Sequence, residues 1–153
     1  EAISGTSRDL RIGSETVTVR IPAGIRPGTK LKVKGKGQAG PDGFTRGDLI
    51  LKVDHQTHPT LELTDDKLYL NQPVPVATMM LGGSINVNTP GKQIRLNLEE
   101  ATPNGKLYRI PGMGFPEFRK PEARGPLYVR IQADIPQYLT AEQKALLRQA
   151  FPS

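Results

Sequence analysis

The sequence predicts an all-β protein of two tandem β-sandwich subdomains that arose by internal duplication, followed by a short C-terminal helix. Short runs alternate polar and apolar residues, the period typical of half-buried strands. The 16 glycines and 14 prolines among 153 residues favour many turns between short elements. One sequence pattern returns after a shift of 77 residues, which indicates a repeated all-β unit.

The repeat is clearest where "GTKLKVKGKG" (28–37) aligns with "GKLYRIPGMG" (105–114). Upstream, the alternating apolar residues of one copy match those of the other: Val17, Val19 and Ile21 match Ile94, Leu96 and Leu98. Downstream the shift becomes 78 residues, so that Gly47 meets Gly125. We therefore expect a first subdomain over residues 1–71 and a second over residues 72–153.

The second copy is preceded by "KLYLNQPVPVATMM" (67–80), which predicts a strand followed by a short helical turn. The first copy has no counterpart of this segment. Glu1 to Gly5 resemble the tail of such a helix. We therefore expect matching residues upstream of Glu1, in a longer protein.

The loop of the first copy contains Gly35-Lys-Gly-Gln-Ala-Gly40, which matches the G-x-G-x-x-G fingerprint of a dinucleotide-binding turn. That turn requires a strand before the glycines and a helix after them. The alternating segment 29–34 supplies the strand, but Pro41 opposes a helix and 48–53 is again strand-like. The sequence therefore predicts a hairpin whose glycines provide positive φ in a long loop.

The C-terminal residues change from strand to helix periodicity. Thr140 and Gln143 form a capping box, and Pro152 ends the helix. The apolar residues of this helix are Leu146, Leu147, Ala150 and Phe151. A helix of about three turns is too short to be stable alone, so its apolar face is expected to dock on the second copy or on another chain.

Composition excludes several classes of protein. The absence of cysteine excludes disulfides and thiolate zinc sites and fits a cytoplasmic location. No apolar run is long enough to span a membrane, and no signal peptide is visible. Two histidines and no G-x-S-x-G motif leave no catalytic arrangement, so neither an enzyme nor a cofactor is expected. The net charge of +6 permits an acidic or nucleic-acid partner.

Two patterns could mark a binding site. His55 and His58 have the H-x-x-H spacing, but they follow a strand and precede Pro59, which favours a loop role over a metal site. Four lysines stand at every second position: Lys30, Lys32, Lys34 and Lys36. On one strand face they would be about 6.8 Å apart and could follow a phosphate backbone. The alternative is the solvated face of a half-buried strand, because acids lie nearby and no aromatic residue interleaves to stack bases.

Some apolar residues exceed what a small subdomain can bury. Ile50 and Tyr128 are predicted to point away from the buried faces of their strands. Met113, Phe115 and Phe118 crowd a loop that contains prolines. Exposed apolar grooves bind proteins or peptides. The alternative, equally open from the sequence, is that the neighbouring repeat covers these residues.

Four segments, which together span almost the whole chain, resemble the C-terminal half of DnaJ-type J-domain co-chaperones. They are "VRIPAGIRPGTKLKVKGKG" (19–37), "RGDLILKVDHQTHPTLE" (46–62), "PVATMMLGGSINVNTPG" (75–91) and "GPLYVRIQADIPQYLTAEQKALLR" (125–148). The resemblance implies two tandem β-subdomains that bind unfolded polypeptide clients, and a C-terminus that forms a homodimer. It places Leu146, Leu147 and Phe151 at that dimer contact and implies a role in protein folding and the stress response.

The chain departs from the full family pattern. The J-domain is absent, since His58-Pro59 is followed by Thr60 and not by the Asp of the His-Pro-Asp signature. The segment is therefore not expected to stimulate a DnaK-type chaperone itself, and handover of clients would pass through the full-length parent. The zinc repeats are also absent, which resembles the zinc-free class with its curved-DNA-binding relatives. Sequence-tolerant DNA binding by the lysine face therefore stays the alternative function.

The resemblance also implies a place for the client, on the first subdomain beside an edge strand. The matching residues are Leu10 and Ile12 of "RDLRI" and Leu51 of "DLILKV". The implied mechanism combines main-chain pairing with an extended peptide and an apolar pocket that accepts one bulky side chain.

Overall fold

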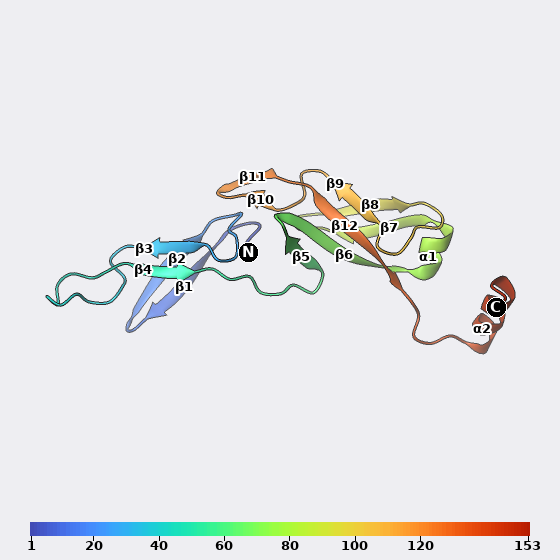
Figure 1. Ribbon diagram of the computed structural model, residues 1–153, viewed down its shortest axis with the longest axis horizontal. Helices are drawn as coiled ribbons and strands as arrows, with labels where there is room; N and C mark the ends of the chain where they lie inside the picture. Colours follow the sequence, from blue (N-terminus) through green and yellow to red (C-terminus); the bar gives the residue numbers. More distant parts are fainter.

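The structure, a computed structural model, describes residues 1–153 and is elongated, with the first β unit at one end and an isolated helix at the other (Figure 1). The first unit contains β1 (Thr6–Ile12), β2 (Glu15–Ile21), β3 (Lys30–Val33) and β4 (Leu49–Lys52). The second contains β5 (Leu61–Thr64), β6 (Lys67–Pro75), α1 (Val76–Leu81), β7 (Gly83–Asn88), β8 (Gln93–Leu98), β9 (Leu107–Ile110), β10 (Pro116–Glu117), β11 (Lys120–Arg124) and β12 (Leu127–Asp134), and α2 (Ala141–Ala150) follows. The predicted all-β class is confirmed.

The first unit consists of two antiparallel hairpins, β1–β2 and β3–β4. Their apolar residues alternate along each strand, and Val17 and Val19 of β2 are the most deeply buried among them. Each hairpin is a sheet of only two strands, so every one of the four strands keeps one unpaired edge.

The second unit has a complete core. A sheet in the order β5-β6-β12-β9 packs on the β7–β8 hairpin, and β12 pairs with β6 in parallel and with β9 antiparallel. The fully buried centre of this sheet is Leu127, Val129 and Ile131, which are 0% exposed. The subdomain boundary expected between residues 71 and 72 falls within β6, and the division into two subdomains itself stays a prediction.

The internal repeat is visible in the main-chain hydrogen bonds. Gly28 N–H donates to Val53 O at 2.8 Å, and Gly105 N–H donates to Ile131 O at 2.7 Å. The bridge that pairs Ala39 with Arg46 returns as the pairing of Pro116 with Arg124. The repeat differs at one edge: β12 is covered by β6, whereas β4 has no neighbour on the corresponding side.

The two units touch through the turn between β10 and β11. Arg119 N–H donates to Ala23 O at 2.9 Å across this contact. Gly24 lies so close that a Cβ atom there would be 2.4 Å from Glu117 O. Phe115, beside the same contact, is buried, and the guanidinium of Arg26 lies 5.5 Å from its ring.

The terminal helix α2 has the predicted capping box. Gln143 N–H donates to Thr140 Oγ1 at 3.1 Å, and Thr140 N–H donates to Gln143 Oε1 at 2.9 Å. None of its residues is buried, so the expectation that it docks on the second copy is wrong, and Figure 1 shows it set apart from both units. Neither helix of the protein is long and apolar enough to cross a membrane.

Candidate functional site

The residues expected to hold a client lie beside unpaired strand edges. β1 pairs only with β2, so its outer N–H and C=O groups are free to bond another strand. Leu10 and Ile12 are two positions apart on β1, on one face, and both are half-buried. Leu10 stands opposite Val17, and Ile12 stands opposite Glu15 at the open end of the hairpin.

Leu51 lies on the other hairpin. It stands opposite Leu31 in the β3–β4 pair and is half-buried on the apolar face of β4. Ile50, its neighbour on the opposite face, is 61% exposed. β4 also keeps its outer edge unpaired, so the three predicted residues are distributed over the two open edges, β1 and β4, of the first unit.

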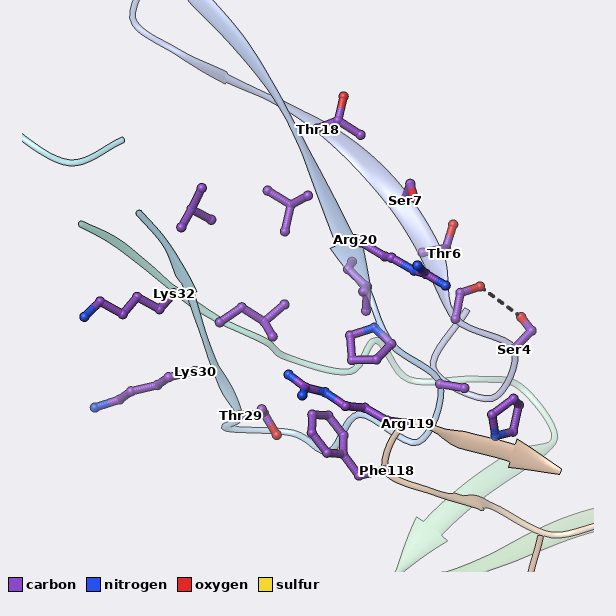
Figure 2. A pocket seen from close by; sticks show the side chains of 18 residues that line it. Ser4, Thr6, Ser7, Thr18, Arg20, Thr29, Lys30, Lys32, Phe118 and Arg119 are labelled. Atoms are coloured by element: carbon purple, nitrogen blue, oxygen red, sulfur yellow. Dashed lines mark hydrogen bonds between the residues drawn. The ribbon is translucent and has the colours of Figure 1, made fainter. Parts of the chain in front are cut away.

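The largest cavity, of about 1170 Å³, lies elsewhere in the first unit, between β2 and β3. Figure 2 shows it from close by, with Arg119 and Phe118 of the second unit at one end. None of the three predicted client residues lines it. The sequence analysis missed this groove because Phe118 and Arg119 are far from β2 and β3 along the chain, and no local pattern connects them.

The lysine series does not form the regular stripe expected from its spacing. β3 ends at Val33, so only Lys30 and Lys32 share a strand face. Lys32 Nζ lies 2.8 Å from Asp48 Oδ2, and this hydrogen bond raises the pKa of Lys32. Lys36 Nζ bonds Glu15 Oε2 at 2.9 Å. Two of the four lysines therefore have acidic partners, and the nucleic-acid role of the series stays a prediction.

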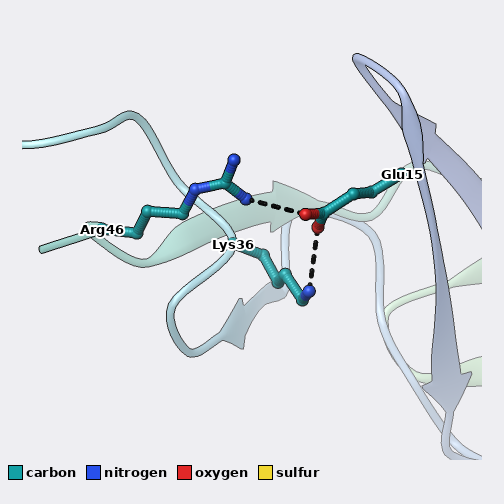
Figure 3. Close-up of polar contacts among 3 residues, drawn as sticks. All are labelled: Glu15, Lys36 and Arg46. Atoms are coloured by element: carbon teal, nitrogen blue, oxygen red, sulfur yellow. Dashed lines mark hydrogen bonds and ion pairs between the residues drawn. The ribbon is translucent and has the colours of Figure 1, made fainter. Parts of the chain in front are cut away.

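Glu15 joins the two hairpins through its cationic partners. Figure 3 shows Lys36 and Arg46 converging on its carboxylate, at 2.9 Å and 3.3 Å. The hydrogen bond from Lys36 is the main cause that lowers the pKa of Glu15, and the charges of Lys36 and Arg46 add to it. The contact connects the tip of β1–β2 with the glycine-rich loop between β3 and β4.

The glycine-rich loop is a hairpin connection, as predicted, and no helix follows it. Ala39 and Arg46 form a bridge across it, and Asp42 accepts hydrogen bonds from the main-chain N–H groups of Phe44 and Thr45. Gly35 has a φ of 66°, so this glycine serves the shape of the turn.

The two histidines have separate contacts. His55 Nε2 lies 2.9 Å from Ile25 O, and its ring centroid is 6.2 Å from that of Phe115. His58 Nδ1 accepts the N–H of Leu61 at 3.1 Å. Both rings therefore stabilise loops, in agreement with the loop role favoured by the sequence.

The surplus apolar residues have different environments. Phe115 is buried and Met113 packs against the core of the second unit. The Tyr128 ring stacks on that of Tyr69, with their centroids 5.4 Å apart. Ile50 and Phe118 remain exposed, at 61% and 43%. The helix residues expected at a dimer contact, Leu146, Leu147 and Phe151, are exposed at 58%, 45% and 59%.

The sequence is similar to that of bacterial chaperones. The chaperone protein DnaJ of Pelagibacter ubique is 36% identical over 135 residues, which cover 88% of this chain and 36% of that protein. The chaperone protein DnaJ 2 of Corynebacterium efficiens is 38% identical over 144 residues, 94% of this chain and 35% of that protein. DnaJ of Burkholderia thailandensis is 37% identical over 136 residues, 89% of this chain and 36% of that protein.

The chain thus spans about a third of the length of these relatives. The family model of the DnaJ C terminal domain matches residues 1–136, which include every strand of both units. The paired glycines, the repeated hydrogen bonds and this match agree. The chain belongs to the DnaJ C-terminal domain family.

Proposed function

We propose that this domain holds unfolded or extended polypeptide clients for a co-chaperone, and that it is not an enzyme. A client strand pairs with the outer edge of β1, and its apolar side chains contact Leu10, Ile12 and Leu51. The observation that supports this most directly is the unpaired edge of β1 beside half-buried apolar residues, in a member of the DnaJ C-terminal family. Handover to a DnaK-type chaperone would use other parts of the full-length protein.

Such a site binds weakly and reversibly. Burying one Leu or Phe side chain of a client contributes about 1.5–3 kcal/mol, and main-chain pairing adds affinity without sequence specificity. Weak binding suits a protein that releases its clients to another chaperone. Two sites in one dimer would raise the overall affinity for a client long enough to reach both.

The test compares two neighbouring residues of β4 that face opposite sides. A fluorescent, uncharged, extended peptide rich in Leu and Phe is titrated into the wild type, Leu51→Ser, Leu10→Ser and the control Ile50→Ser. Leu51→Ser and Leu10→Ser are expected to raise Kd about tenfold, because each removes an apolar contact of this size. Ile50→Ser should leave Kd unchanged, since Ile50 points away from that face.

Circular dichroism confirms that each variant is folded. If the folded Leu10→Ser and Leu51→Ser variants bind the peptide as well as the wild type, the client site is wrong. The salt dependence tests the DNA alternative: binding through four phosphates would fall with a log–log slope of about −3.6. Peptide binding at an apolar face should change little between two salt concentrations.

We also propose that α2 mediates a homodimer. Its three large apolar side chains are exposed and have no partner within the chain, and a second copy of α2 would cover them. Sedimentation velocity at increasing protein concentration is expected to reveal a dimer for the wild type and a monomer for Leu146→Ser/Leu147→Ser/Phe151→Ser. The control Lys144→Ser/Gln149→Ser changes polar residues of the same helix and should retain the dimer.

A further inference from the structure

The groove between β2 and β3 is separate from the edges assigned to the client. It opens on the side of β2 that faces away from β1 and on the side of β3 that faces away from β4. Its floor is apolar, and its residues come from the inward positions of both strands: Val19, Ile21, Leu31 and Val33. The free main-chain groups of the two strands lie along its length.

The rim of the groove is cationic. Four positive side chains and no acidic side chain line it: Arg20, Lys30, Lys32 and Arg119. Lys32 is paired with Asp48, which lies outside the lining, whereas the other three have no ion pair. Lys30 also stands directly opposite Lys52 in the β3–β4 pair, an arrangement of like charges that costs free energy until an anion offsets it.

The second unit closes one end of the groove. Phe118 and Arg119 come from the turn between β10 and β11, and the Arg119 guanidinium lies 5.0 Å from the centre of the Phe118 ring (Figure 2). The hydrogen bond from Arg119 N–H to Ala23 O fixes this turn against the first unit. The groove is therefore built from both halves of the chain.

The matching edge of the second unit lacks these charges. A shift of 77 residues places Asn97 at the position of Arg20 and Leu107 at the position of Lys30. Asn97 accepts a hydrogen bond from the Ser84 hydroxyl at 2.7 Å and is not free. A solvated strand face needs no particular cations, and the repeat confirms that the fold forms without them. The positive rim is thus a property of the first unit alone.

We propose that this groove binds an extended acidic peptide in which apolar and acidic residues alternate. The main chain of the peptide pairs with the free edge of β2, so that successive side chains point to opposite sides. Apolar side chains rest on Val19 and Leu31. The carboxylates face the rim, where Arg20, Lys30 and Arg119 are unpaired. A peptide fits better than a nucleic acid because the floor is aliphatic and Phe118 is the only aromatic residue of the lining.

The experiment uses a fluorescein-labelled decapeptide that alternates Glu and Val, titrated by anisotropy into the 153-residue chain. Arg20→Glu/Lys30→Glu is expected to raise Kd at least about tenfold, because both cations become repulsive. The matched control is Lys92→Glu/Arg95→Glu, which makes the same change of net charge at two exposed residues of the second unit. Its Kd should stay within about twofold of the wild type.

Two further measurements separate this groove from other sites. A peptide that alternates Glu and Ser should bind markedly more weakly than the Glu–Val peptide, because it leaves the floor uncovered. Leu51→Ser should leave Kd for the Glu–Val peptide unchanged, which keeps this result independent of the proposed client site. The proposal is overturned if the control weakens binding as much as Arg20→Glu/Lys30→Glu does. It is equally overturned if Leu51→Ser abolishes binding, or if a single-stranded oligonucleotide of equal charge displaces the peptide and binds more tightly.

Discussion

Gly24 lies where the two units meet, and its main chain has a φ of 74°. Gly13, at the tip of the β1–β2 hairpin, has a similar φ of 62°, but a Cβ atom there would have no neighbour within 4 Å. Alanine at either position costs about 1–3 kcal/mol of backbone strain. At Gly24 alone, the new Cβ would also lie 2.4 Å from Glu117 O, so the turn 116–121 must shift.

We therefore expect Gly24→Ala to lower the free energy of unfolding more than Gly13→Ala does. Urea unfolding of the two variants measures the difference. Amide chemical shifts of residues 116–121 should change in Gly24→Ala and remain unchanged in Gly13→Ala. Equal losses of stability with unperturbed shifts would contradict the close contact between the units.

Glu15 is a residue whose contacts depend on pH. Its hydrogen bond with Lys36 lowers the pKa of the carboxyl from its usual 4.5. Because the folded pKa is below the unfolded one, the contact stabilises the protein above the unfolded value and is lost as pH falls through the folded value. A carboxyl ¹³C titration is expected to give a midpoint below 4.5 in the wild type.

Substitutions of two neighbouring lysines test the cause of that shift. Lys36→Ala should move the Glu15 midpoint upward, toward 4.5, since the first and largest cause is removed. Lys34→Ala removes an equal charge nearby without touching Glu15 and should leave the midpoint in place. A midpoint that responds equally to both substitutions would mean that the shift reflects general charge only.

Helix α2 is the element most exposed to solvent, so its capping box matters more than in a packed helix. Thr140→Ala removes the side-chain acceptor for Gln143 N–H and is expected to cost about 1 kcal/mol of helix stability. The far-UV circular dichroism signal of the helix should decrease. Gln149→Ala, in the last turn of the same helix, should preserve or raise the signal, since alanine favours helices. A loss in both variants would argue against the cap as the cause.

Elements were predictable where the signal is local. The alternation of Val17 and Val19 marks β2, and the Thr140 box marks the start of α2, within a residue of the observed bounds. The short β10 has only two residues, and its pairing with β11 depends on a turn that carries no strand pattern. The parallel pairing of β6 with β12 joins segments far apart in sequence, and no pattern within either strand specifies its partner.

The same limit applies to the candidate sites. Leu10, Ile12 and Leu51 were placed by their match to a family motif, and the structure puts them beside open edges. The cationic groove required knowing that Arg119 lies against Ala23. The outward position of Arg20 on β2 was visible in the sequence, but its combination with residues of the second unit was not.

At the scale of the whole molecule, the two units differ in how much they bury. The second unit contains a cluster of 10 buried residues. The buried apolar residues of the first unit are Val17, Val19, Ala23 and Ile25. Local stability follows the density of buried contacts and the protection of main-chain hydrogen bonds. The first unit should therefore open more often than the second.

Native-state hydrogen exchange measures this difference. Amides of β12, which pair on both sides with β6 and β9, are expected to exchange slowest. Amides of the β3–β4 pair should exchange faster by at least about an order of magnitude. The matched comparison is β9, a strand of the same length as β3 in the repeat but attached to the complete sheet. Identical protection of β3 and β9 would contradict the unequal stability.

The parallel ladder of β6 and β12 has a mechanical consequence. It joins eight residue pairs, from Leu127 with Leu68 to Asp134 with Pro75. A polypeptide that tugs on the first unit loads the amino end of β6, while α2 leaves from the carboxyl end of β12. Tension between these points shears all eight pairs together, whereas the β1–β2 hairpin, pulled at its open end, would unzip one rung at a time. The link between a gripped chain and the terminal helix is thus the part of the molecule built to resist traction.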